Sequence, residues 1–508
     1  MPMPVPVLAT WSLCFLRGKW FCLACWVQYI EHETLRLASS MSFFFSFSAL
    51  QRYPGHHGHP PPTFAMATAY KIAVRASGTR LCKVQQTEEA ASKVSELLQE
   101  DLQKHHTFFN DSGFHNHLAH QLLTLYGTGA APSTLQAAYD ANRTYQMAAK
   151  PVRDSVVALL QDWPANAPSF LGRGDHYPDF LSHFQREIER RGWQAVVEEH
   201  LCRDTPQSRD MVQRLFSGIA HPMIHLAYGL EWEQPALVAA GLAQAAVHPN
   251  RLGEFFDKVD KATATAAPAP SRRSLAEVCE AVRADHPDLV ATATFNDDNP
   301  LYNGVLGTGL QEAVELAATL TVGEDDVDER TAELLHLNAY VAAAAAAGHP
   351  PHLPKFDFFL LHSLTSAPFV LSFNKPFIPL RARVRMLEHK MRFDLMQYIA
   401  RGSPPLGVQP IRDFRVSRDD ASAAARPQDL LPRYHAVPDD GHLVKVARAL
   451  LLAEQESGKW KGRPWIRLQD GRDWLNVHHM LLRGVEGQKT LWVMGAGFQE
   501  AWKDVPEL

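Results

Sequence analysis

Histidine is the residue type with the most chemical potential in this sequence. The chain of 508 residues contains 25 histidines, and histidine is both the commonest metal ligand and the usual proton carrier near neutral pH. His117 and His120 are three residues apart, and His221 and His225 are four apart. Residues at these spacings share one face of a helix, so each pair could hold a metal ion or transfer a proton. We expect His115 to project elsewhere.

Further candidates lie in segments that are mainly apolar. His336 ends a Glu333-Leu-Leu-His336 run, His362 follows a run of Phe and Leu, Lys390 follows Glu-His, and His442 follows Asp-Gly. Burying several imidazoles is costly unless each has a partner, and one shared metal on facing helices would supply it. A di-iron carboxylate centre needs two Glu-x-x-His motifs, and only the one at Glu333 is present.

The elements that must carry these residues are helices. Apolar residues recur at helical spacing over 88–103 and 118–126, and again in later segments. Ser133-Thr-Leu-Gln136 has the form of a capping box that opens another helix. The later predicted helices are 178–190, 207–217, 221–232, 273–284, 308–320, 326–347, 356–373, 382–400 and 441–455. Strand-like alternation is rare, so we predict a mainly α protein: a single large multi-helix body with a histidine-rich interior site and a small C-terminal extension.

Composition divides the chain into three parts. Residues 1–80 are unlike the rest and are expected to be an extension, a targeting stretch or an over-extended gene start. Residues 81–405 form the predicted helical core, and residues 406–508 are the C-terminal part of the same domain. The Ala- and Pro-rich stretches Ala262–Ser271 and Asp419–Pro427 are expected to be surface loops. We expect a cytoplasmic protein, with organelle targeting by the extension as the alternative.

Bulk properties exclude several classes of function. Apolar residues make up 46% of the chain and charged residues 21%, which is typical of a globular protein. A formal net charge of −5 disfavours nucleic acid as a partner. No apolar stretch reaches 18 residues, so we expect no membrane span. The chain has no Gly-x-Gly-x-x-Gly after a strand, no phosphate-binding loop, no His-Glu-x-x-His and no flavin signature.

Several of these motifs resemble the questin oxidase-like family. They are the runs 113–126, 221–232, 357–363, 387–394 and 440–445, which occur in the expected order and span about residues 85–480. The resemblance implies an oxidoreductase of fungal aromatic polyketide pathways, which oxygenates or opens quinone-like rings in a Baeyer–Villiger-like step with O2. It also implies possible use of NADPH. Without a dinucleotide-binding fingerprint, NADPH would bind in an unfamiliar way or serve a separate reductase.

We hypothesise a mononuclear non-haem iron at the histidines, with an aromatic small molecule as substrate. The predicted metal ligands are His117, His225, His336, His362 and, as the carbamate of a buried amine, Lys390. The predicted catalytic residues are His120, His221 and His442, although Asp440-Gly-His442 could instead cap a helix. Two alternatives stay open. The histidines could act as general bases without a metal, or the chain could be a helical binding or scaffold protein without catalysis.

Overall fold

The computed structural model describes residues 66–265, 273–416 and 424–508. Most of the predicted extension 1–80 and parts of the two predicted loops therefore lie outside the described residues. Of the predicted loop Ala262–Ser271, residues 262–265 instead complete a helix, and Pro427 opens a short 3₁₀ turn. The chain is mainly α, as predicted, and β pairing in the described residues is confined to isolated bridges.

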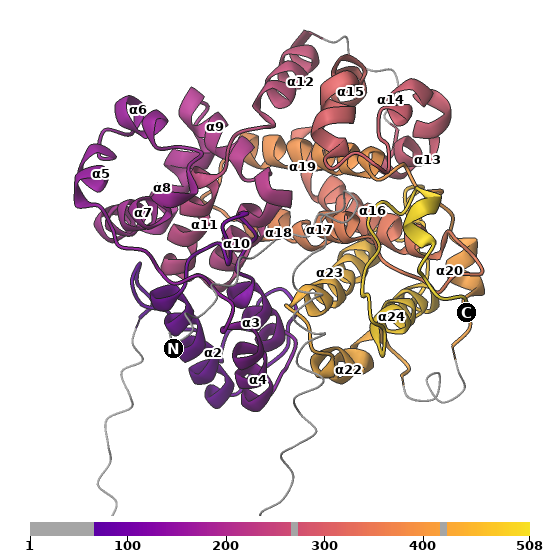
Figure 1. Cartoon of the computed structure of the whole chain (residues 1–508), viewed down its shortest axis with the longest axis horizontal. Coiled ribbons are helices and arrows are strands. Elements are labelled where there is room, and N and C mark those ends of the chain that lie inside the picture. The colour runs from indigo at the N-terminus through magenta and orange to yellow at the C-terminus, as the bar shows by residue number, and fades with distance from the viewer. Residues whose placement is uncertain (1–65, 266–272, 417–423) are drawn as a thin grey trace, which may run out of the picture.

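The helices follow one another through short connections and form one body (Figure 1). The N-terminal half contains α2 (Glu88–Lys104), α3 (Leu118–Gly127), α4 (Pro132–Asn142), α5 (Asp154–Leu159), α6 (Trp163–Asn166), α7 (Tyr177–Arg191), α8 (Trp193–Val197), α9 (Pro206–Arg214), α10 (Ser217–Trp232), α11 (Pro235–Val247) and α12 (Gly253–Thr265). The C-terminal half contains α13 (Leu275–Asp285), α14 (Pro287–Ala291), α15 (Leu310–Ala318), α16 (Val327–Ala347), α17 (Phe358–Ser366), α18 (Phe369–Phe373), α19 (Leu380–Ala400), α20 (Gln409–Asp413), α22 (Leu431–Ala436), α23 (His442–Ser457) and α24 (Gly471–Val485). Short 3₁₀ or π turns lie at Ala167–Ser169, Gly174–His176, Glu198–Cys202, Leu301–Thr308, Glu324–Asp326, Pro427–Leu430, Gly458–Trp460 and Gln499–Trp502.

Local sequence explains where several helices begin and end. α2 opens at Thr87, whose side chain accepts a hydrogen bond from the Ala90 amide. The predicted capping box at Ser133 is wrong, because α4 begins at Pro132, one residue earlier, without a side-chain cap. The predicted helix 356–373 is two helices, α17 and α18, because Pro368 lacks the amide that would continue the first.

A central set of helices forms the frame of the molecule. α3 packs against α10 and α23, and α17 also packs against α10 and α23. These contacts close a ring, α3–α10–α17–α23, which lies near the middle of the view in Figure 1. α16 packs against α17 and α23 from outside the ring, and most of its residues are buried. Side chains that point into this ring are therefore enclosed by helices from distant parts of the sequence.

The segment 406–508 shares the main core of the molecule. Leu450 of α23, Met480 of α24 and Trp502 near the C-terminus belong to the same cluster of buried apolar residues as α10 and α16. A smaller apolar cluster joins α2, α3 and α4 to α10 and α11. None of the described helices combines the length and apolar character that crossing a bilayer requires.

Candidate active site

Histidines from all four helices of the ring converge in its interior. α3 contributes His120 and, at its N-terminal boundary, His117; α10 contributes His221 and His225. α17 contributes His362, and α23 begins at His442. All of these rings are buried. The structure therefore brings together six of the eight residues that the sequence singled out.

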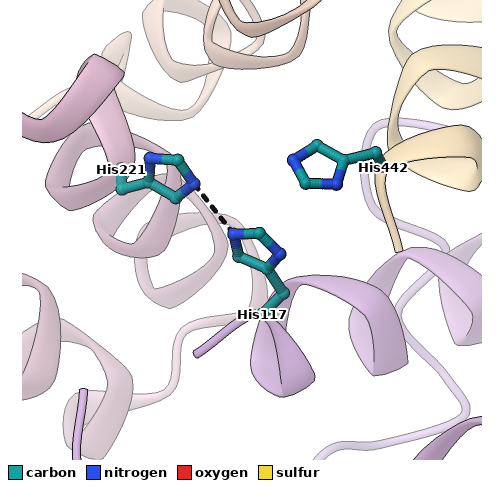
Figure 2. A group of neighbouring side chains, drawn as sticks. All are labelled: His117, His221 and His442. Atoms are coloured by element: carbon teal, nitrogen blue, oxygen red, sulfur yellow. Dashed lines mark hydrogen bonds between the residues drawn. The ribbon is translucent and has the colours of Figure 1, made fainter. Parts of the chain in front are cut away.

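The centre of the group is His117, His221 and His442. One ring nitrogen from each lies within 4.8 Å of those of the other two. Figure 2 shows the three rings turned toward one another, with a contact of 2.9 Å between the Nε2 atoms of His117 and His221. Ligands at about 2.1 Å from one ion, at right angles to each other, are separated by about 3.0 Å. The spacing of these two nitrogens thus fits adjacent ligands of a single metal ion.

His221 is aimed by a distortion at the start of α10. Gly218, Ile219 and Ala220 have positive φ angles of 55°, 57° and 59°, and for Ile and Ala such angles are strained. Regular helix resumes at His221, with Pro222 in its first turn, where a missing amide costs nothing. The Gly218 carbonyl accepts a hydrogen bond from His221 Nδ1 at 2.6 Å. This bond leaves His221 Nε2 facing the other rings.

Asp440 aims two more of the rings. Its Oδ1 accepts a hydrogen bond from His442 Nδ1 at 2.5 Å, and its Oδ2 lies 3.2 Å from His117 Nδ1. The capping role considered for Asp440 belongs to its neighbour Asp439, whose carboxylate accepts from the Gly441 and Leu443 amides. Burial opposes ionisation of Asp440, but its contacts with His442 and His117 hold its pKa well below the ordinary value. An ionised Asp440 is thus the acceptor that orients both rings.

His362 completes a shared pattern. Its Nδ1 donates to the Phe358 carbonyl at 2.5 Å, and its Nε2 lies 3.2 Å from His442 Nε2. His117, His221, His362 and His442 therefore all use Nδ1 for an oxygen acceptor and direct Nε2 at a neighbouring imidazole. A metal-binding imidazole has this arrangement, because the outer hydrogen bond fixes the tautomer and leaves the inner nitrogen free to coordinate.

His120 and His225 form a separate pair beside this group. His120 Nε2 lies 3.2 Å from His225 Nδ1, while His120 Nδ1 and His225 Nε2 have no hydrogen-bond partner among the described residues. The His120 ring is stacked on Tyr228, with centroids 5.8 Å apart. Two buried nitrogens without partners are costly in a protein core, so this pair is a further candidate for contact with a ligand.

His115 and His248 extend the cluster on the other side. The expectation that His115 projects elsewhere is wrong, because its ring stacks on His221 with centroids 4.0 Å apart. His115 Nε2 also lies 2.8 Å from His248 Nε2. His248 follows α11, a helix that was not predicted because all its residues except Gln244 are apolar or small and it has no amphipathic period. No sequence spacing links His248 to the other histidines.

Burial keeps these imidazoles neutral at physiological pH. It lowers the pKa of His117 to about 3 and those of His225 and His248 to about 4. The pKa values of His120, His221 and His362 also fall well below the ordinary value, first because of burial and then because neighbouring imidazoles and Lys445 disfavour a further positive charge. Neutral imidazoles keep a lone pair, which both metal binding and proton abstraction require.

Lys445 is the cation beside these rings. Its Nζ is buried and has no hydrogen-bond partner among the described residues, and its charge contributes to the lowered pKa values of His117, His120, His221, His362 and His442. Burial lowers the pKa of Lys445 itself to about 8. Lys445 is not among the residues predicted from the sequence, although its place three residues after His442 puts both on one face of α23.

His336 and Lys390 lie elsewhere in the structure. His336 Nδ1 contacts the Ser457 hydroxyl at 2.9 Å, and its Nε2 accepts from the amide of Arg467 at 2.8 Å. Lys390 donates to the Ser363 carbonyl at 3.0 Å and forms a buried ion pair with Asp394. Because these partners already occupy both residues, we leave them out of the site.

A cavity of about 660 Å³ opens beside the histidine cluster. Its wall includes His248 and Gly218, which contact His115 and His221, and Phe359 of α17. On the far helix, Gln397 of α19 and Arg401 also line it. A space of this size is typical of small-molecule sites.

Residues 114–450 match the model of a family described as Questin oxidase-like. The chain belongs to this family. Among its relatives, a questin oxidase from Aspergillus terreus is 34% identical over 453 residues, which is 87% of this chain and 99% of that protein. Baeyer-Villiger oxidase ptaJ from Pestalotiopsis fici is 33% identical over 434 residues, 83% of this chain and 94% of that protein. Oxidoreductase AflY from Aspergillus parasiticus is 33% identical over 454 residues, 82% of this chain and 90% of that protein.

Membership of the questin oxidase-like family identifies the chain as an enzyme and an oxidoreductase. The matched segment runs from the residue before His115 to α23, so it includes every histidine of the ring, Asp440 and Lys445. Catalysis is therefore the role of a chain with this cluster, and a scaffold without activity is the weaker interpretation.

Proposed function

We propose that this chain is an oxygenase that uses O2 to oxygenate or open the ring of an aromatic, quinone-like small molecule at a mononuclear non-haem iron. The names of the relatives support the class of reaction. The observation that carries the iron hypothesis is the shared pattern of four buried imidazoles, each with Nδ1 anchored to oxygen and Nε2 turned inward. In this proposal His117, His221 and His442, whose ring nitrogens lie within 4.8 Å of one another, hold the metal. His362, which contacts His442, would be a fourth ligand, with His120 and His225 beside the site.

Four neutral imidazoles leave the charge of Fe(II) uncompensated, and Lys445 is suited to provide an anion. Its buried amine, with a pKa of about 8, is partly neutral at physiological pH and can react with carbon dioxide. The nitrogen–carbon bond forms, one proton leaves, and the product is a carbamate. This is the role first considered for Lys390, and Lys445 fits it better because its Nζ has no partner among the described residues.

When bound, iron would supply the electrons that activate O2 and a positive charge for a substrate oxyanion. The chain's own residues would do the rest. Asp440 and the Gly218 carbonyl keep the imidazoles oriented, and the apolar ring of helices limits the access of water. The cavity beside His248 would hold the substrate in contact range of the site. His120, with a free Nδ1, is placed to accept or return a substrate proton.

The electron balance decides whether a reductase is needed. If both oxygen atoms enter the substrate, no external electrons are required. If one atom is inserted, as in a Baeyer–Villiger step, the second leaves as water and two electrons and two protons must be supplied. We propose NADPH, acting through a separate reductase, as the source in that case, since the described residues contain no parallel sheet of the dinucleotide-binding kind.

Metal analysis of the purified enzyme tests the proposal. We expect about one iron per chain in the wild type and strong loss of iron in His117→Ala and His221→Ala, with loss of O2 consumption. His435→Gln is the control, since His435 contacts Thr128 and lies outside the cluster. Full activity in a protein with only traces of iron would refute the iron hypothesis and favour direct general-base chemistry by the same histidines.

A further inference from the structure

Arg401 is a buried cation that has no carboxylate partner in the part of the chain that the structure describes. It follows the last residue of α19 and is 6% exposed. Among the described residues it forms no ion pair within 4.0 Å, and its Nε has no hydrogen-bond partner. Its guanidinium carbon lies 4.0 Å from the ring centroid of Phe359. Burying a guanidinium without a carboxylate partner is costly. A bound anion would offset this cost.

Two carboxylates act on the charge of Arg401, but neither forms an ion pair with it. Burial lowers the pKa of Arg401 to about 10, and Asp357 and Asp297 partly oppose that shift. Asp357, however, caps α17 through the amides of Phe359 and Leu360 and also accepts from the amides of Gly495 and Ala496. Asp297 accepts from Asn299 and Asn303. Arg401 therefore faces the cavity with its donors available.

Gln397 adds a second polar group at the same end of the cavity. It lies one helical turn before Arg401 on α19, is buried, and its Oε1 has no partner among the described residues. Both residues line the cavity that also touches His248 and Gly218. The cavity wall also includes the aromatic rings of Phe359 and Tyr302, and Arg251 is stacked on Tyr302 at 3.8 Å.

We propose that Arg401 binds an oxyanion carried by the aromatic substrate, either a carboxylate or an ionised phenol, and that Gln397 hydrogen-bonds to an oxygen beside it. The ring system then lies along Phe359, with its opposite end toward the histidine cluster. This inference rests on the proposed function, because the ligand it describes is the substrate of that reaction. It makes Arg401 a positioning residue that favours acidic over neutral aromatics.

Binding of tricyclic probes tests the inference without turnover. We would titrate the purified enzyme, in the absence of O2, with anthraquinone-2-carboxylate, 2-hydroxyanthraquinone and 2-methylanthraquinone at pH 8.5, and follow tryptophan fluorescence. We expect at least one acidic probe to bind about tenfold or more tightly than the methyl compound. Whichever of the two acidic probes binds more tightly shows whether the site prefers a carboxylate or an ionised phenol.

Substitutions then assign the preference to a residue. Arg401→Met should abolish it, Arg401→Lys should keep part of it, and Gln397→Leu should reduce it less. Lys150→Gln is the matched control, because Lys150 lines the same cavity but is exposed; its preference should stay within about twofold of the wild type. Equal preference in Arg401→Met and wild type, or no preference in wild type, would overturn the inference.

The outcomes also separate this inference from the proposed function. If the protein prefers the acidic probes through Arg401 but oxidises no aromatic compound, the anion site is supported and the proposed oxygenase function is refuted. Oxidation of acidic anthraquinones by Arg401→Met with an unchanged KM does the reverse. If Arg401→Met fails to fold, Arg401→Lys and Gln397→Leu still decide, since both retain most of the buried volume.

Discussion

At the scale of single residues, the outer nitrogen of each imidazole decides what the inner one can do. Asp440 serves two rings at once, which makes it the most connected acceptor in the cluster. Lys445 and Lys390 show the same principle for amines. Both are buried, but Lys390 is committed to Asp394, whereas Lys445 has no partner among the described residues. Whether a buried amine can react or bind a ligand therefore depends on its hydrogen-bond and ion-pair partners rather than on burial alone.

Asp440→Asn should weaken metal binding. An amide has one acceptor oxygen and a donor group in place of the second oxygen, so either His117 or His442 loses the acceptor for its Nδ1. Loss of such an orienting partner typically lowers metal affinity by about 10- to 100-fold. Competition with a chelator of known affinity measures the change, with Asp413→Asn as the surface control. Equal affinity in both variants would contradict the orienting role.

The two lysines should respond oppositely to replacement by Met. Lys390→Met leaves Asp394 as a buried carboxylate without its cation, which should lower the free energy of unfolding by about 3–5 kcal/mol. Lys445→Met removes a buried amine that has no hydrogen-bond partner among the described residues, so stability should hold or rise while iron content falls. Urea denaturation and metal analysis on the same preparations check both statements. A stable Lys390 variant that loses iron would return that residue to the site.

At the scale of elements, the ring α3–α10–α17–α23 explains which parts of the site could be predicted from the sequence. Spacing within one helix predicted that His117 and His120, and His221 and His225, belong together. Which helices would bring their histidines together could not be predicted from spacing. His336 and His362 both lie in apolar segments, but α16 is not one of the four ring helices, and its His336 contacts Ser457. The position of His248 and the irregular start of α10 depend on tertiary packing, so no local sequence pattern predicts them.

Gly218→Ala tests the distorted start of α10. A Cβ at this position would lie 2.7 Å from Cε1 of both His115 and His248, on a backbone with φ +55°. We expect a loss of about 2–4 kcal/mol in the free energy of unfolding, from strain and steric conflict together, and loss of metal because His221 moves. Thermal unfolding and metal content are the measurements.

Gly462→Ala is the control for this effect. Gly462 also has a positive φ, +86°, but nothing lies within 4 Å of the added Cβ. It should show the strain alone, about 1–2 kcal/mol, and keep its metal. If the two variants lose the same stability and both retain metal, the packing of Gly218 against the histidines has no special role.

At the scale of the whole molecule, buried neutral histidines make stability depend on pH. Burial lowers the pKa values of His200 and His478 to about 3, against about 6.5 in the unfolded chain. Well above pH 6.5 these histidines are neutral in both the folded and the unfolded state, so they do not make the stability depend on pH. As the pH falls below 6.5, only the unfolded state takes up the proton, so stability declines until the folded pKa is reached.

His200→Phe should reduce this decline. The ring lies among Trp163 and Phe184, with centroids 4.7 and 5.1 Å away, so an apolar ring suits the site. Between pH 6 and pH 4 the slope of unfolding free energy against pH should fall by about 1.4 kcal/mol per unit relative to wild type. Urea titrations at several pH values measure it, with an unchanged slope as the contrary result.

The contact between His117 and Asp440 joins positions 323 residues apart in the chain. During synthesis, a ribosome must therefore complete most of the polypeptide before these two residues can meet. Shorter nascent chains carry the first histidine pairs without the carboxylate that orients them and without Lys445. Assembly of the histidine cluster is consequently a late event in the life of each molecule, since such distant pairings form slowly.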